Sequence, residues 1–243
     1  MNSGYYAACA GLRAQTQALE VVASNLANLS TAGYRGQQPV FRSLLAGATA
    51  LASDPLNRAI NDFNVMGEAR VDRSAGNLQP TGNPLDLAIE GGGFFVVQTK
   101  NGIRYTRDGN FQVSAQGLMT TSTGDAVLGD QGPVSVPSGP LSISADGTLS
   151  MNGAVSGQIR MVEFPPNASL VPEGTSYYAA SSAPSPATTS YMRQGMLESS
   201  NVNAVLATVS LISVQRRFDM LEGAMSAYYA TFNRIAAQDL PRV

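Results

Sequence analysis

Two long stretches, one near each end of the chain, carry mostly apolar side chains at steps of alternately three and four residues. Near the N-terminus this stripe consists of Tyr5, Ala8, Leu12, Gln15, Leu19, Val22, Leu26 and Leu29. Near the C-terminus it consists of Ala204, Ala207, Leu211, Val214, Phe218, Leu221, Met225, Tyr228, Phe232 and Ile235. This spacing places one apolar seam along one side of an α-helix. Because such a seam needs a partner helix, we expect the two terminal helices to pair as in a coiled coil.

The ends of both helices are marked in the sequence. The first helix is expected over residues 3–29, and Gly33 is suited to the left-handed turn that often follows a helix. The second is expected over residues 203–238, which at 1.5 Å per residue is about 54 Å long. Beside its main seam, a second apolar row contains Val202, Val205, Val209 and Ile212. Two adjacent apolar rows favour a helix with more than one neighbour.

The region between the helices has the pattern of short β-strands. Glycine-containing turns such as Lys100-Asn101-Gly102 and Asp146-Gly147 separate short runs of apolar and β-branched residues. Strands are expected at 85–89, 94–97, 103–106, 110–113, 118–121, 127–128, 134–136, 141–143, 148–150 and 159–164. So many strands within so short a stretch indicate a twisted β domain, sandwich-like or barrel-like.

The predicted fold class is therefore α+β, with a central all-β domain and two long terminal helices that pair in an inner domain. We expect residues 1–33 to form the N-terminal helix of that inner domain and residues 34–75 to form an extended connector. Residues 76–190 are expected to form the β domain, and residues 191–243 to carry the C-terminal helix.

Composition and charge narrow the possible functions. Charged residues make up 13% of the chain, against about 25% in ordinary domains, and the net charge is −2. A surface short of charge is typical of proteins that pack against copies or partners, although low-charge secreted proteins share it. Without a basic run, nucleic acid is not an expected partner. The sequence shows no signal peptide and no apolar window long enough to cross a membrane.

The sequence offers little catalytic chemistry. It contains no His and a single Cys, Cys9, so neither a zinc or haem site of ordinary type nor a Ser–His–Asp relay is expected. The Glu90-Gly91-Gly92-Gly93 segment leads into a strand, whereas a phosphate-binding loop leads into a helix. Asp86, Glu90 and Asp108 suggest a glycosidase-like carboxylate pair, but turn hydrogen bonding explains them as well. We therefore expect no enzyme activity, no cofactor and no metal.

Four stretches resemble the signatures of the bacterial flagellar rod and hook protein family. Residues 24–35 (SNLANLSTAGYR) are similar to its N-terminal signature, residues 85–97 and 105–128 to its central motifs, and residues 194–203 (QGMLESSNVN) to its C-terminal signature. The matching residues are Asn25, Leu26, Ala27, Asn28, Thr31, Gly33, Tyr34, Arg35, Gly91, Gly93, Phe94, Phe95, Tyr105, Thr106, Arg107, Gly109, Gly195, Leu197, Glu198, Ser200, Asn201 and Val202. The chain departs from the pattern at Ser24, Ser114 and Asp219.

The resemblance implies a structural role. Members of the family are exported through the flagellar type III apparatus and assemble in the periplasm, with other rod proteins, into a helical tube that transmits torque from motor to hook. Within the family, the length and the residues from 132 to 148 are most similar to proximal rod proteins, with distal rod proteins as the alternative. Outside it, a carbohydrate-binding or carbohydrate-processing β domain and a pilus-like fibre stay open.

Overall fold

A computed structural model describes residues 3–43, 64–66, 69–136 and 139–239 of the chain. The chain divides into two compact units. A helical unit comprises residues 1–26, 37–69 and 204–243, and a β unit comprises residues 27–36 and 70–203. The domain boundaries expected from the sequence stay a prediction, because much of the expected connector (residues 44–63, 67 and 68) lies outside the described residues.

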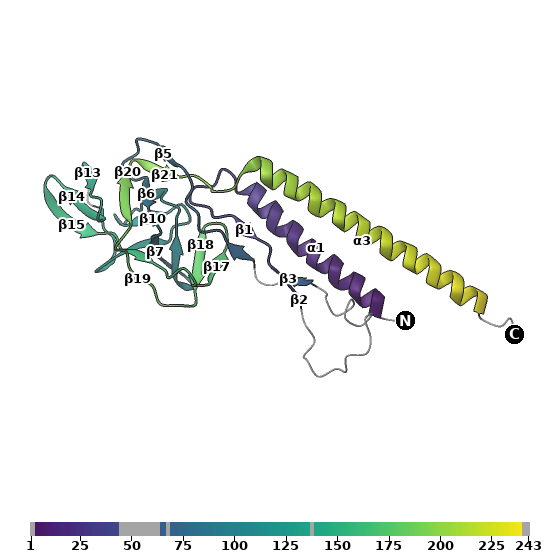
Figure 1. Ribbon diagram of the computed structural model, residues 1–243. Helices are drawn as coiled ribbons and strands as arrows, with labels where there is room; N and C mark the ends of the chain where they lie inside the picture. Colours follow the sequence, from purple (N-terminus) through teal and green to yellow (C-terminus); the bar gives the residue numbers. More distant parts are fainter. Residues whose placement is uncertain (1–2, 44–63, 67–68, 137–138, 240–243) are drawn as a thin grey trace. The chain divides into compact units, whose positions relative to one another are not determined.

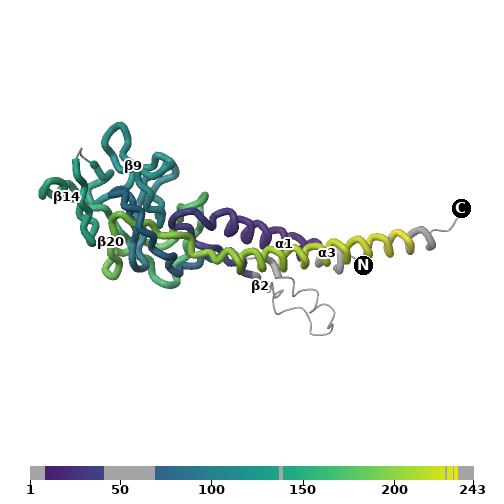
Figure 2. The backbone as a smooth tube through the Cα atoms, turned by 90° about the horizontal axis from the view of Figure 1, so that it is seen from above, coloured from purple at the N-terminus to yellow at the C-terminus, as the bar shows by residue number. Residues whose placement is uncertain are grey.

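The helical unit contains the two predicted helices, α1 (Ser3–Ala27) and α3 (Ala204–Asp239), which lie side by side in both views (Figure 1, Figure 2). Ala18, Val22 and Val214 form a buried cluster between them, and Leu19 and Leu211 pack against it. At Gly11 a side-chain carbon would lie 3.6 Å from Leu221, so the helices approach each other closely there as well.

On α3 most of the described seam positions are buried or half-buried. Ala207 and Val214 are buried, and Leu211, Phe218, Leu221 and Met225 are half-buried, whereas Ala204 is exposed. On α1 Val22 is buried, and Leu12, Leu19, Leu26 and Leu29 (which follows the helix) are half-buried. The side chains of Tyr5, Ala8, Tyr228, Phe232 and Ile235 lie outside those that the structure describes.

The remaining elements are short strands, and most belong to the β unit (Figure 1). They are β1 (Gln37–Gln38), β2 (Phe41–Ser43), β3 (Asn64–Met66), β4 (Arg70–Val71), β5 (Leu78–Pro80), β6 (Leu87–Glu90), β7 (Phe94–Thr99), β8 (Gly102–Thr106), β9 (Phe111–Val113), β10 (Met119–Thr121), β11 (Ala126–Gly129), β12 (Gly132–Pro133), β13 (Leu141–Ile143), β14 (Thr148–Met151), β15 (Ala154–Gln158), β16 (Met161–Glu163), β17 (Leu170–Glu173), β18 (Tyr177–Ala180), β19 (Ser185–Pro186), β20 (Tyr191–Gln194) and β21 (Met196–Glu198).

The main sheet of the β unit is antiparallel, with the strand order β17-β18-β8-β7-β11-β10-β9; β12 pairs with β11, β16 with β7 and β19 with β16. Smaller sheets are β13-β14-β15, β20-β6 and β21-β5. Within the described residues the main path is open, with β17 and β9 at its ends. The barrel-like alternative was therefore wrong, because no pairing joins these two end strands.

Two hydrophobic clusters lie on opposite faces of β7. Its side chains alternate between faces, as in any strand, so Phe95 and Val97 enter one cluster while Phe94 and Val96 enter the other. Phe95 makes an edge-to-face contact with Phe111 at 5.0 Å between ring centroids. The strand β7 is therefore buried on both faces and lies at the centre of the β unit.

The expected strands agree with the structure over most of the β unit, with some differences. The strand expected at 134–136 is instead the short β12 at residues 132 and 133. Val134 and Val136 are nonetheless buried, and their backbone N–H groups donate to Val127 and Gly117. Within the β unit, the sequence pattern did not indicate β4, β5, β15, β17, β18, β19, β20 or β21.

Candidate functional site

The segment that follows α1 lies beside the segment that precedes α3 within the β unit. Gly33 N donates a hydrogen bond to Glu198 O at 2.7 Å, and Gly36 N donates to the side-chain oxygen of Asn201 at 2.7 Å. Asn201 N in turn donates to Tyr34 O at 3.3 Å. The N-terminal and C-terminal signature segments are therefore hydrogen-bonded to each other.

Two charged side chains from these segments, Arg35 and Glu198, form a buried cluster with Arg107 of a central motif; it is here called the signature cluster. Glu198 Oε1 lies 2.7 Å from Arg35 Nη2, and Glu198 Oε2 lies 3.2 Å from Arg107 Nη1. All three side chains are no more than 2% exposed. One carboxylate therefore serves two guanidinium groups, and the cluster carries a net charge of +1.

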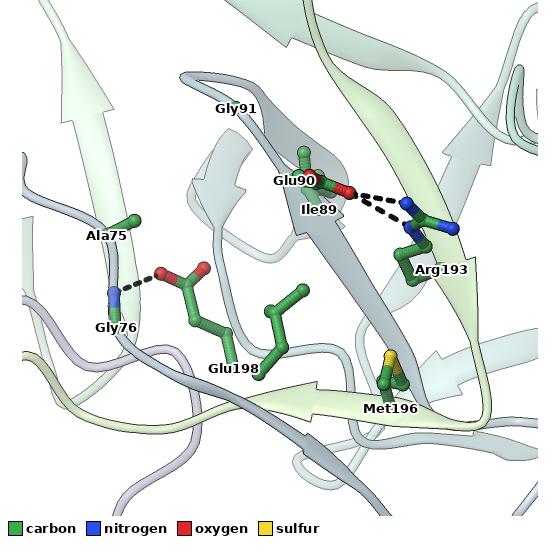
Figure 3. A pocket seen from close by; sticks show the side chains of 9 residues that line it. Ala75, Gly76, Ile89, Glu90, Gly91, Arg193, Met196 and Glu198 are labelled. Atoms are coloured by element: carbon green, nitrogen blue, oxygen red, sulfur yellow. Dashed lines mark hydrogen bonds and ion pairs between the residues drawn. The ribbon is translucent and has the colours of Figure 1, made fainter.

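Backbone groups complete much of the signature cluster. Gly76 N donates to Glu198 Oε1 at 2.7 Å, a contact seen at the edge of a cavity in Figure 3. Arg107 donates to Ile89 O at 2.8 Å and to Gly91 O, while Arg35 donates to Ser74 O. Among the described residues, the Nε atoms of both arginines have no hydrogen-bond partner. Because charged groups are costly to bury without full pairing, this cluster depends strongly on Glu198.

Burial also changes the acid–base properties of the groups around the cluster. Burial lowers the pKa of Arg107 to about 10; the attraction of Glu198 opposes this shift and the repulsion of Arg35 adds to it. The Arg107 guanidinium lies 5.2 Å from the centre of the Phe94 ring. Burial raises the pKa of Tyr178 to about 12, and its hydroxyl accepts a hydrogen bond from Arg35 N at 3.2 Å. At neutral pH Arg107 is therefore still charged.

Two signature glycines permit backbone contacts that no other residue would allow. Gly33 has a φ of +65°, as predicted, and a side-chain carbon there would lie 2.2 Å from the backbone carbon of Arg107. At Gly109 a side-chain carbon would lie 1.6 Å from the carbonyl oxygen of Leu87, whose N–H donates to Gly109 O at 3.0 Å. Gly33 thus brings the N-terminal signature into direct contact with a central motif, and Gly109 brings the two central motifs together.

The other signature residues also lie at identifiable positions. The Asn25 side chain bonds both backbone groups of Gln37, at 2.7 and 2.8 Å, within the helical unit. Thr31 Oγ1 donates to Asn28 Oδ1, and Ser200 Oγ accepts from Val202 N. Tyr34, Phe94, Phe95 and Thr106 are buried; Leu26, Tyr105, Gly195 and Leu197 are half-buried; Gly91 and Ala27 are exposed; and Gly93 is buried.

The carboxylates considered for catalysis have other partners. Glu90 pairs with Arg193 at 2.9 Å on the surface, where both side chains are more than half exposed (Figure 3). Asp86 accepts a hydrogen bond from the Asn83 side chain at 3.0 Å, and Asp108 accepts one from Asn110 N at 3.0 Å. Burial raises the pKa of Asp108; the hydrogen bond from Asn110 opposes the shift. Turn hydrogen bonding, as expected from the sequence, accounts for Asp108.

A cavity of about 420 Å³ borders the signature cluster, lined among others by Ile89, Arg193, Met196 and Glu198 (Figure 3).

In the described part of the chain, no group of three or more His, Cys, Asp or Glu side chains is placed to hold a metal ion. No helix among the described residues is both long and apolar enough to cross a membrane. Cys9 is half-buried and has a free thiol.

No feature of the sequence predicts that Arg35, Arg107 and Glu198 meet. Each is a charged residue within a motif made mainly of glycines, small residues and apolar residues. This unusual position is the one feature of the sequence that could have drawn attention to them. A charged residue inside such a motif is either exposed or paired, and pairing across more than ninety residues between Arg107 and Glu198 is a property of the folded chain.

Three family models match the chain. They are described as "Flagella basal body rod protein" (residues 6–35), "Flagellar hook protein FlgE/F/G D1 domain" (88–151) and "Flagellar basal body rod FlgEFG protein C-terminal" (193–234). Each matched region contributes one residue of the signature cluster: Arg35, Arg107 and Glu198, respectively.

Relatives match over nearly the whole chain. The flagellar basal-body rod protein FlgF of Caulobacter vibrioides is 31% identical over all of both chains. FlgF of Escherichia coli (strain K12) is 33% identical over 90% of this chain and 91% of its own. The flagellar basal-body rod protein FlgG of Buchnera aphidicola is 30% identical over 89% of this chain and 92% of its own.

Proposed function

The chain belongs to the bacterial flagellar rod and hook protein family and is a structural subunit of the basal-body rod, and we propose that its place is the proximal rod. The FlgF of Caulobacter vibrioides, which matches over the full length of both chains, supports this place. The distal rod is the alternative, because FlgG relatives match at similar identity. In either place the chain assembles with other rod proteins.

The observation that carries a role in subunit assembly is the side of α3 that faces away from α1, here called its outward side. One side of this helix packs on α1 through Leu211 and Val214, so the helix already has a partner within the chain. Val205, Val209 and Ile212 of the second predicted row are nevertheless 71, 58 and 47% exposed. Neighbouring apolar side chains that are exposed together are typical of contact surfaces. In the rod, neighbouring subunits would cover them.

We propose that α1 and α3 pair as a coiled-coil-like layer inside a helical tube, with the predicted seam residues as its contacts. Burial of Ala18, Val22 and Val214 between the helices supports this pairing. Many such contacts along a helix of 36 residues would make the tube stiff enough to transmit torque. The load is then shared among shallow contacts rather than concentrated at one site.

The signature cluster has a separate task in this proposal. The chain leaves α1 and returns to α3 through two segments that are hydrogen-bonded to each other in the β unit, as Gly33 and Glu198 show. The ion pairs of Arg35 and Arg107 with Glu198 fix these segments to the central strands. The cluster would therefore hold the base of both helical segments under load.

Export through the flagellar type III apparatus and assembly in the periplasm belong to the same proposal, and their support is the family itself. A carbohydrate-processing activity is less favoured, since the carboxylates considered for it are engaged by turn hydrogen bonds and an ion pair. The structural role of the family also argues against a carbohydrate-processing activity.

Electron microscopy of basal bodies from a strain lacking this gene tests the proposed place. Loss of everything beyond the inner-membrane ring is the result expected for a proximal rod subunit. A short rod without its distal segment would assign the chain to the distal rod instead. Complete basal bodies in that strain would contradict a role in the rod altogether.

A further inference from the structure

Three turns of the β unit surround a polar cavity of about 410 Å³, here called the turn cavity. Lys100 and Asn101 belong to the turn between β7 and β8, and Asp125 follows the turn between β10 and β11. Glu173 and Tyr177 border the turn between β17 and β18. The turn cavity shares no lining residue with the cavity beside the signature cluster, so neither the cluster nor the helices explain it.

A fixed network of hydroxyl groups forms one wall of the turn cavity. The Tyr177 hydroxyl lies 2.6 Å from Thr123 Oγ1, 2.8 Å from Thr121 Oγ1 and 2.8 Å from Asp125 Oδ2, to which it donates. Thr123 Oγ1 also donates to Asp125 Oδ2 at 2.8 Å. The Tyr177 side chain packs against the main hydrophobic cluster, which anchors the hydroxyl. These polar groups therefore keep their geometry before any ligand arrives.

The charges of the turn cavity balance. Arg104 pairs with Glu173 through two contacts, one of them 3.0 Å between Nη2 and Oε1. Lys100 and Asp125 add one further charge of each sign, so the cavity has no net charge to attract an anion or a cation. Its described lining includes no aliphatic side chain, which disfavours an apolar ligand. What it offers is a set of donors and acceptors in a concave surface.

We propose that the turn cavity binds a neutral saccharide. The hydroxyl groups of a sugar both donate and accept hydrogen bonds, and the cavity presents both kinds of partner on rigid turns. Hydroxyl, carboxylate and guanidinium groups that are already held by one another bind a ligand with little loss of conformational freedom. Saccharide binding here is a second property of the chain and is independent of its assembly through α3.

Titration of the full-length chain with two neutral probes, a trimer of N-acetylglucosamine and maltotriose, tests the proposal, with amide chemical shifts as the readout. We expect saturable shifts at residues of the three turns with at least one probe. Preference for the first probe would indicate an amino-sugar polymer as the natural ligand, and preference for the second a glucan. Absence of saturable shifts with both probes would overturn the proposal.

Variants separate specific from nonspecific binding. Tyr177→Phe removes one hydroxyl and keeps the ring, and the loss of one hydrogen bond should weaken binding about fivefold. Tyr191→Phe removes the hydroxyl of an exposed tyrosine on β20, outside the turn cavity, and should leave the affinity unchanged. Asn101→Ala alters an exposed turn residue of the cavity and serves if Tyr177→Phe unfolds. Equal affinity of the wild-type chain and the two cavity variants would contradict the proposal.

Discussion

Replacing Glu198 by Gln should destabilise the β unit severely. The substitution keeps the size of the side chain but removes the single carboxylate that faces Arg35 and Arg107, both almost fully buried. Breaking a buried ion pair from one side costs about 3 to 5 kcal/mol. Ordinary domains have only about 5 to 15 kcal/mol of total stability, so the variant should lie near the limit of folding.

A matched control is available at Glu90 on β6. Glu90→Gln makes the same chemical change in an ion pair with Arg193, whose side chains are 53 and 58% exposed, respectively. An exposed pair contributes about 1 kcal/mol or less, so this variant should unfold close to the wild type.

Urea unfolding of the full-length chain, followed by tyrosine circular dichroism, measures both variants. We expect the midpoint of Glu198→Gln to fall well below that of Glu90→Gln, with a similar slope. Losses of stability that agree within about 1 kcal/mol would refute the reasoning, since exposure would then have no influence on what the carboxylate contributes.

Three further predictions concern the β unit. Gly109→Ala should prevent native folding, because its side-chain carbon would meet backbone, whereas Gly92→Ala, with nothing within 4 Å, should fold; thermal unfolding compares them. Burial acts to raise the pKa of Glu163, but hydrogen bonds from Ser190 and Thr189 outweigh it, so the pKa lies below 4.5 and the stabilisation present above pH 4.5 is lost as pH falls through the folded value. The protection factor of the Thr189 amide, that is the intrinsic exchange rate divided by the measured rate at the same pH, should thus fall in acid, and Glu163→Gln should remove that pH dependence. Peptidoglycan incubated with the chain should stay intact; released muropeptides would restore the enzyme hypothesis.

The terminal helices could be predicted because their pattern is local. A heptad stripe shows in the sequence wherever a helix is packed on one side, and both helices were found within a few residues of their expected ends. The contact face was less well predicted on α1, where the fully buried Ala18 lies beside the stripe. Alanine gives a weak hydrophobic signal, yet its small size is what allows two helices to approach closely.

Whether a strand could be predicted depends on how far along the sequence its pairing partner lies. Strands joined by tight turns, such as β7 and β8, have their signal in the turn itself, which was confirmed. β20 pairs with β6, and β21 with β5, across more than a hundred residues, and no turn marks these pairs. The signature cluster was missed for the same reason, because its members meet only in the folded chain.

The central claim, that the outward side of α3 joins subunits in the rod, is tested most directly by changing Ile212. Basal bodies from a strain that produces Ile212→Asp at the wild-type level would be examined by electron microscopy, with Ile212→Leu as the control that keeps the side chain apolar. Ile212 is 47% exposed, so the charge should leave the chain itself folded. We predict truncated rods and no motility for Ile212→Asp, and complete rods for Ile212→Leu. Complete rods and normal motility with Ile212→Asp would contradict the account.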